Sequence, residues 1–205
     1  MSVATSIGKT GAMGGLTFNE ATSLATDGQI THAVQVPPGE TSILTLRTSD
    51  TVGELTIDDS GHTIDTGERL DLYWIESGVK KRRRGVVVGT VAGDVVPITG
   101  GTGDILPSSS TPITASEPVE LDVAVLGTNV KAILLFTAKN GQFVFEDVGG
   151  EVFFVQLDDN KAFSYNENEI PVNPITGDTL KSIFVSHDDP AVAQEMKIGL
   201  AYDNA

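Results

Sequence analysis

The chain of 205 residues contains no cysteine. This absence excludes disulfide bonds, thiolate metal sites and cysteine nucleophiles, so any durability must come from packing or assembly. Histidine is also rare. His32, His62 and His187 show none of the paired spacings, such as H-E-x-x-H or H-x-H, that form a zinc site. We therefore expect no bound metal and no cofactor.

Basic residues and long apolar runs are scarce. The chain has 13 Lys and Arg against 28 Asp and Glu, a formal net charge of −15. This balance disfavours binding to nucleic acid or to an anionic membrane surface. No segment approaches the roughly 18 consecutive apolar residues of a membrane-spanning helix, and the N-terminus lacks the pattern of a secretory signal. The sequence predicts a soluble acidic protein that makes no membrane contact.

Catalytic motifs are missing too. No G-x-S-x-G nucleophile elbow occurs. Gly8-Lys9-Thr10 is not a phosphate loop, because Val3 stands where that motif requires a glycine. The acidic pairs Asp58-Asp59, Asp158-Asp159 and Asp188-Asp189 match no twelve-residue calcium loop. We predict no enzymatic activity and assign no catalytic residue; a hydrolase that uses two facing carboxylates stays open as an alternative.

Short β-strand patterns fill the chain instead. Apolar residues alternate at Leu44 and Leu46 and again at Leu70, Leu72 and Trp74, and turn-forming residues bound each run. Strands that recur about every 8 to 12 residues are typical of an antiparallel sandwich or barrel. The continuous run 132–136 predicts a central strand that is buried on both faces.

The two halves of the chain resemble each other loosely. Thr48, Gly53 and Trp74 in the first half correspond to Thr137, Gly141 and Tyr165 in the second, each about 90 residues later. The sequence Pro-Ile-Thr-Gly also occurs twice, at 97–100 and 174–177. The repeat predicts an all-β protein of two related antiparallel β-sandwich modules of jelly-roll type.

The module boundaries follow composition. A glycine-, serine- and proline-rich stretch at 101–118 predicts a linker. The modules then cover 16–100 and 119–205. The small, polar residues 1–15 predict a flexible N-terminal arm that extends from the first module.

One basic run interrupts this acidic chain. Lys80, Lys81, Arg82, Arg83 and Arg84 follow one another, and we expect them in a loop between strands that end near Ile75 and begin near Val86. The run fits a solvated hairpin tip. It also fits a docking loop that reaches the acidic face of an adjacent subunit, whereas nucleic-acid contact is less favoured without interleaved aromatic residues. We predict partner-binding residues in this run, together with Lys9 of the arm.

Three segments of the second half carry a family resemblance: VKAILL at 130–135, EIPVNP at 169–174 and MKIGLAYD at 196–203. In the order and residue composition of its expected strands, the half that contains these segments resembles small β-sandwich proteins encoded among tailed-phage structural genes. The resemblance implies an oligomeric virion component, assembled in the host cytoplasm, that decorates the head or serves as a minor capsid protein. Its partners would be the major capsid protein or other virion subunits. A receptor- or carbohydrate-binding module of a tail or a cell-surface appendage is the alternative.

Overall fold

The structure, a computed structural model, describes residues 3–8, 21–26, 28–57, 61–123, 129–147, 149–166, 175 and 180–203. All regular elements in these ranges are β-strands, which confirms the prediction of an antiparallel all-β protein. The same ranges hold no helix that could span a membrane. The chain divides into two compact units: Met1–Gln35, Val119–Val185 and Gln194–Ala205 form the first, and Val36–Pro118 and Ser186–Ala193 form the second.

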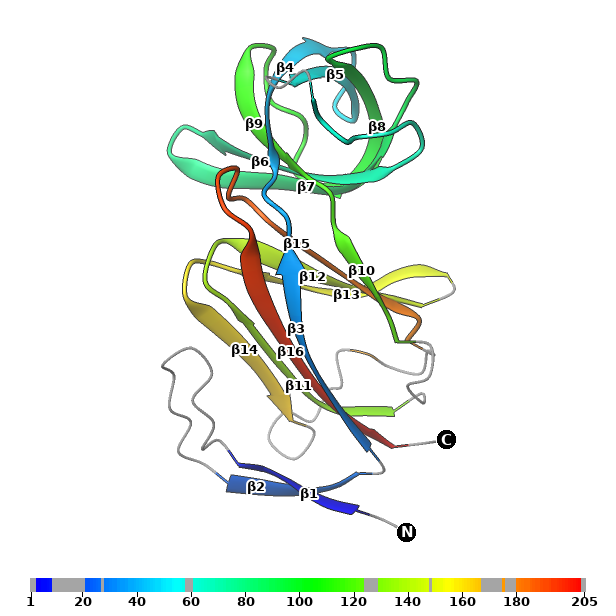
Figure 1. The fold of residues 1–205 in the computed structure, drawn as a ribbon, viewed down its shortest axis with the longest axis vertical. Coiled ribbons are helices and arrows are strands. Elements are labelled where there is room, and N and C mark those ends of the chain that lie inside the picture. The colour runs from blue at the N-terminus through cyan, green and yellow to red at the C-terminus, as the bar shows by residue number, and fades with distance from the viewer. Residues whose placement is uncertain are drawn as a thin grey trace. The chain divides into compact units, whose positions relative to one another are not determined.

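The first unit contains one two-stranded sheet and two four-stranded sheets (Figure 1). The two-stranded sheet pairs β1 with β2, and the larger sheets have the orders β10-β15-β12-β13 and β14-β11-β16-β3. The strands are β1 (Val3–Gly8), β2 (Ala21–Thr26), β3 (Gly28–Val36), β10 (Val119–Asp122), β11 (Asn129–Thr137), β12 (Gly141–Asp147), β13 (Gly150–Leu157), β14 (Lys161–Asn166), β15 (Ser182–His187) and β16 (Gln194–Asp203).

Burial in the first unit follows the predicted strand positions. β11 lies between β14 and β16, and Ile133, Leu135 and Phe136 on its two faces are buried, so the predicted central strand is confirmed. An aromatic contact joins the two four-stranded sheets, because the ring of Phe153 on β13 lies 5.9 Å from that of Phe163 on β14.

The second unit is a closed six-stranded barrel of order β4-β5-β8-β7-β6-β9. Its strands are β4 (Glu40–Arg47), β5 (Val52–Ile57), β6 (Arg69–Glu76), β7 (Val79–Val88), β8 (Val95–Gly103) and β9 (Thr111–Ser116). Alternate side chains of these strands point inward and form one apolar core that includes Leu44, Leu55, Leu72, Trp74 and Ile98. Because the barrel is closed, each of its strands pairs with a neighbour on both sides over at least part of its length.

One alternation prediction is wrong. Leu44 is fully buried, but Leu46, expected on the same face, is 46% exposed. The pairing of β4 with β5 shifts by one residue between Leu44 and Leu46. A β-bulge of this kind turns the following side chains to the opposite face.

The domain boundaries also differ from the prediction. The expected linker 101–118 contains the end of β8 and the whole of β9, which pairs with β4 and β6. Turn-forming residues mark where this chain bends, not where a domain ends. The part of the arm at Val3–Gly8 is a strand paired with Ala21–Thr26 rather than a flexible segment.

The predicted pair of related sandwiches is wrong for the second unit, which is a barrel. Trp74 lies on β6, whose sheet closes into a barrel, whereas its counterpart Tyr165 lies on β14, an outer strand of an open four-stranded sheet. The two units therefore have different topologies. The residues that recur in both halves reflect what β-strands and turns require in general.

Candidate interaction site

The strands β6 and β7 form a hairpin that extends past its neighbours in the barrel. Their pairing runs from Arg69↔Val87 to Glu76↔Val79, but β9 pairs with β6 only at residues 71–73 and β8 begins to pair with β7 at Arg83. Residues 74–81, here called the ribbon, thus have no third strand in the barrel sheet (Figure 1). Ser77 and Gly78 close the ribbon with φ angles of 51° and 78°, as expected for a two-residue type I′ turn.

A proline lies close to where the ribbon leaves the barrel. Tyr73 pairs with Thr114 of β9, so continued pairing would set Ile75 opposite Pro112. Pro112 has no N–H with which to extend this ladder.

The predicted basic loop is part of a strand. All five residues from Lys80 to Arg84 belong to β7, because the turn before them needs only two residues. The expectation of a loop between Ile75 and Val86 is therefore wrong. Lys9, the remaining predicted partner-binding residue, lies outside the described residues.

Arg83 and Arg84 do not form an exposed docking surface. Both side chains are buried, at 5% exposure. Arg83 donates three hydrogen bonds to backbone carbonyls: from Nε to Gly100 at 2.6 Å, from Nη2 to Gly101 at 2.7 Å and from Nη1 to Asp104 at 2.9 Å. These bonds hold the glycine-rich end of β8 against β7, which is a structural role.

Carboxylates balance much of the remaining positive charge. Lys81 donates a hydrogen bond to Asp104 at 3.0 Å, the backbone N–H of Arg82 donates to the same carboxylate at 3.0 Å, and Lys80 lies 3.9 Å from Asp188. Although burial acts to raise the pKa of Asp104, the hydrogen bonds from Arg82 and Lys81 and their charges lower it below its ordinary value. Electrostatics alone thus gives the ribbon little excess charge with which to bind an acidic surface.

The ribbon presents apolar side chains instead. Ile75 is 66% exposed and Val79 is 55% exposed, on either side of the Ser77-Gly78 turn. Ile75 has the highest exposure among the large apolar residues of the described chain. Ile75 is therefore the apolar side chain that the ribbon exposes most fully to another molecule.

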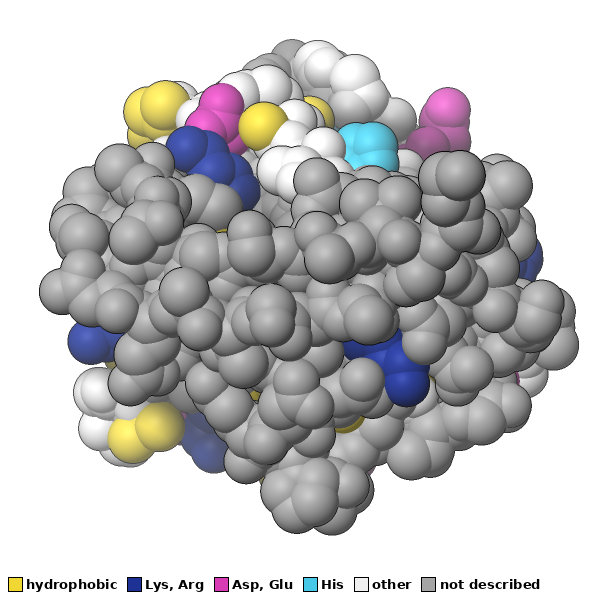
Figure 2. Space-filling model, turned by 90° about the horizontal axis from the view of Figure 1, so that it is seen from below, with side chains coloured by type: hydrophobic (Ala, Val, Ile, Leu, Met, Phe, Trp, Pro, Cys, Tyr) yellow, Lys and Arg dark blue, Asp and Glu magenta, His cyan; other side chains and the backbone are white. Residues whose placement is uncertain are grey.

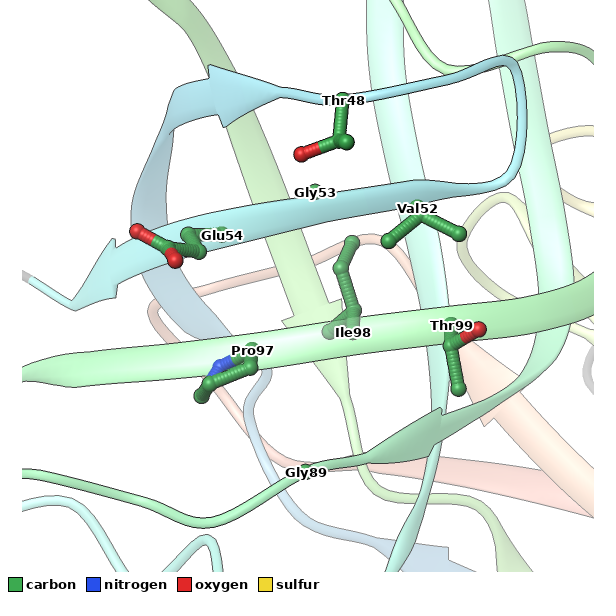
Figure 3. Close-up of a pocket in the computed structure, with 8 residues that line it drawn as sticks. All are labelled: Thr48, Val52, Gly53, Glu54, Gly89, Pro97, Ile98 and Thr99. Atoms are coloured by element: carbon green, nitrogen blue, oxygen red, sulfur yellow. The ribbon is translucent and has the colours of Figure 1, made fainter.

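A shallow pocket of about 180 Å³ lies on the barrel between β5 and β8 (Figure 3). Val52 and Pro97 supply apolar side chains, whereas Ile98 is 2% exposed and belongs to the barrel core. Gly53 and Gly89 also line the pocket. Thr48, Glu54 and Thr99 complete the lining.

A buried polar cluster fastens residues 186–193 to the barrel. The Ser186 hydroxyl donates to one oxygen of Asp71 at 2.5 Å, and the Tyr73 hydroxyl donates to Ser186 Oγ at 2.7 Å. The other Asp71 oxygen accepts the backbone N–H of Gly85 at 2.7 Å. Asp71, Tyr73 and Ser186 are each at most 3% exposed. The three side chains lie too deep to meet a substrate, and they join segments that are distant in sequence.

His187 adds a second attachment next to this cluster. Its Nδ1 accepts the N–H of Asp189 at 3.1 Å, so its Nε2 carries the proton and donates to the carbonyl of Val36 at 3.1 Å. Gly39 donates its N–H to the carbonyl of Asp189 at 3.1 Å. The imidazole is fully buried and hydrogen-bonded through both nitrogens, so it links the carbonyl of Val36 to the backbone of Asp189.

The phenol of Tyr73 should make the second unit sensitive to alkali. Burial, followed by the charge of Asp71, raises its pKa well above the ordinary value. Because the folded state keeps this proton more tightly than the unfolded state, its contribution to stability is complete below the ordinary pKa of about 10 and is lost as the pH rises toward the folded value. We expect urea midpoints to fall more steeply between about pH 9.5 and 11 for the native chain than for Tyr73→Phe. Parallel curves for the two proteins would contradict this assignment.

The described residues provide no metal centre. No group of three or more His, Asp or Glu side chains in the described ranges is placed to bind an ion. Asp188 and Asp189 serve the ribbon and the turn at Ala191, and His62 contacts the carbonyl of Gly93. On the molecular face drawn in Figure 2, the described basic and apolar side chains that are visible lie apart from one another.

Comparisons with known proteins identify no family. No family model and no curated protein matches the chain. Among solved structures, VP17, a capsid protein of bacteriophage P23-77, matches with 9% identity and a TM-score of 0.24, over 84% of this chain and 80% of VP17. The resemblance to a phage structural protein is thus diffuse.

Sequence reasoning missed the two surfaces that define this site. The Ser-Gly pair at 77–78 was a usable signal, because such a pair between alternating residues marks a tight turn. The pocket gave no signal, since its residues come from four separate stretches of the barrel.

Proposed function

We propose that the chain is a non-enzymatic structural component of a virion, a capsid subunit or a protein that decorates the capsid. In this proposal the first unit is a jelly roll, and the barrel is inserted between its first two strands. The resident partners are other virion subunits, including copies of the chain itself.

The strand order carries the proposal. In a jelly roll, eight successive strands form two sheets of orders 1-8-3-6 and 2-7-4-5. When β3 is taken as strand 1 and β10 to β16 as strands 2 to 8, the two four-stranded sheets have the orders 6-3-8-1 and 2-7-4-5. Jelly rolls of this kind build viral capsid domains, and they also occur in lectins and cupins.

The site supports an assembly role within that class. A cupin or a lectin would need a metal or a ligand groove, and the described residues offer a shallow pocket and an exposed hairpin. A rigid β scaffold with exposed apolar contacts suits a protein whose binding to an assembled lattice stabilises that lattice. Of the basic run, Lys80, Lys81 and Arg82 are the residues that remain available as partner contacts, because Arg83 and Arg84 are buried.

The test is the location of the chain in particles. We expect antibodies against the purified chain to label intact virions from the cells that carry its gene, and we expect mass spectrometry of gradient-purified particles to find many copies per particle. A wash in about 1 M salt, where the screening length falls to about 3 Å, separates bound subunits from electrostatic contaminants. Absence of the chain from washed particles would overturn the proposal.

A further inference from the structure

We propose that the ribbon of one copy inserts Ile75 into the β5–β8 pocket of a second copy, forming a head-to-tail contact between barrels. The proposal deepens the assembly role above by naming the partner and both contact surfaces. It rests on that role only for its biological purpose, since the contact can be measured on the purified chain.

The ribbon is preorganised to serve as the inserting part. Its turn is a type I′ turn, and its base is fixed by Arg83 and by Asp104. A rigid hairpin loses little conformational entropy on binding. Ile75 can therefore be presented without a folding step.

The pocket can accept an aliphatic side chain. Its volume is about 180 Å³. Val52 and Pro97 give its lining apolar side chains, so burial of the Ile75 side chain against them is favourable. Leu46, 46% exposed and paired with Glu54 across β4 and β5, extends the apolar surface beside the pocket.

The charges around the two surfaces are complementary. Cross-strand partners share a face of a sheet, so Lys80, paired with Ile75, and Arg82, paired with Tyr73, flank Ile75 on one face of the ribbon. Glu54 lies at the rim of the pocket. Lys80 and Arg82 are thus placed where they can face Glu54 and orient the contact.

Because the ribbon and the pocket are different parts of the barrel, the contact is heterologous. Such a contact leaves one unused ribbon and one unused pocket on every dimer, so it closes into a ring or continues as a chain. A heterologous contact can therefore extend beyond a dimer, as a lattice of subunits does.

Sedimentation velocity of the full chain, from about 5 to 500 µM, tests the proposal. We expect the sedimentation coefficient of the native chain to rise with concentration. Ile75→Asp on the ribbon and Thr99→Arg in the pocket should each weaken association at least about tenfold, and Thr48→Arg is a second pocket variant should Thr99→Arg fail to fold. Ile75→Val and Ile105→Asp should associate as the native chain does. Ile105 is a matched control because it is 59% exposed and lies on neither surface.

A mixing experiment separates this contact from a symmetric one. An equimolar mixture of Ile75→Asp and Thr99→Arg retains one intact ribbon and one intact pocket, and we expect dimers but nothing larger. Dimers in the mixture support the proposal. A native chain that stays monomeric, an Ile75→Asp variant that associates normally, or a mixture that stays monomeric each overturns it. None of these outcomes decides whether the chain occurs in virions, which the particle labelling decides independently.

Discussion

Asp71→Ala is expected to lower the free energy of unfolding of the second unit by about 3 kcal/mol. The carboxylate is 1% exposed and accepts hydrogen bonds from the Ser186 hydroxyl and from the Gly85 N–H. Alanine removes the acceptor of the buried Ser186 hydroxyl and of the half-buried Gly85 N–H, and a donor left without an acceptor costs about 1 to 3 kcal/mol when it is buried. The attachment of residues 186–193 to the barrel weakens at the same time.

Trp74 makes the measurement selective. It is the single tryptophan of the chain and lies in the barrel core, so its fluorescence during urea unfolding reports on the second unit. Asp94→Ala is the matched control, since Asp94 is an exposed aspartate on the same unit. We expect its unfolding curve to overlay that of the native chain. A loss below about 1 kcal/mol for Asp71→Ala would show that the cluster contributes no more than an ordinary hydrogen bond.

The sequence could not reveal this cluster. Asp71 stands between Leu70 and Leu72, the alternation of a strand with one face in water, and the natural prediction for Asp71 is exposure. Ser186 lies 115 residues later, and nothing local indicates that its segment covers the outer face of β6. Tertiary packing decides which polar residues of an alternating strand are buried.

Local patterns succeeded where one strand sufficed. The all-β class, the central strand β11 and most inward-facing barrel residues follow from alternation and turn chemistry. They failed where a single residue changes the register, as at Leu46. They also failed at the basic run, where charge density suggested a loop although each residue occupies an ordinary strand position.

Local sequence patterns could not predict the division of the chain into two units either. The chain passes from one unit to the other four times, at residues 35–36, 118–119, 185–186 and 193–194. A nested arrangement leaves no compositional boundary, because every connection continues in or near a strand. Turn-rich composition at 101–118 therefore pointed to a linker where β9 completes the barrel.

The glycines at the end of β8 test a second structural feature of the barrel, the close approach of β7 and β8. Gly100 and Gly101 both have positive φ angles, of 77° and 72°. A β-carbon on Gly100 would have no atom within 4 Å, whereas one on Gly101 would lie 2.7 Å from the carbonyl oxygen of Arg84 and 2.8 Å from Cγ1 of Val86. The two positions thus differ in the space around them and share the same backbone conformation.

Gly101→Ala is expected to destabilise the second unit by about 3 kcal/mol or more, and Gly100→Ala by about 1 to 2 kcal/mol. Both variants carry the cost of a side chain at positive φ, so their difference measures the clash with β7. Relief of that clash would move the Gly101 carbonyl away from Arg83, which donates to it at 2.7 Å, and would leave a buried guanidinium N–H without its acceptor. Urea unfolding followed by Trp74 fluorescence measures both values. Equal losses for the two variants would show that β7 and β8 separate at little cost, and that Arg83 does not fix the base of the ribbon.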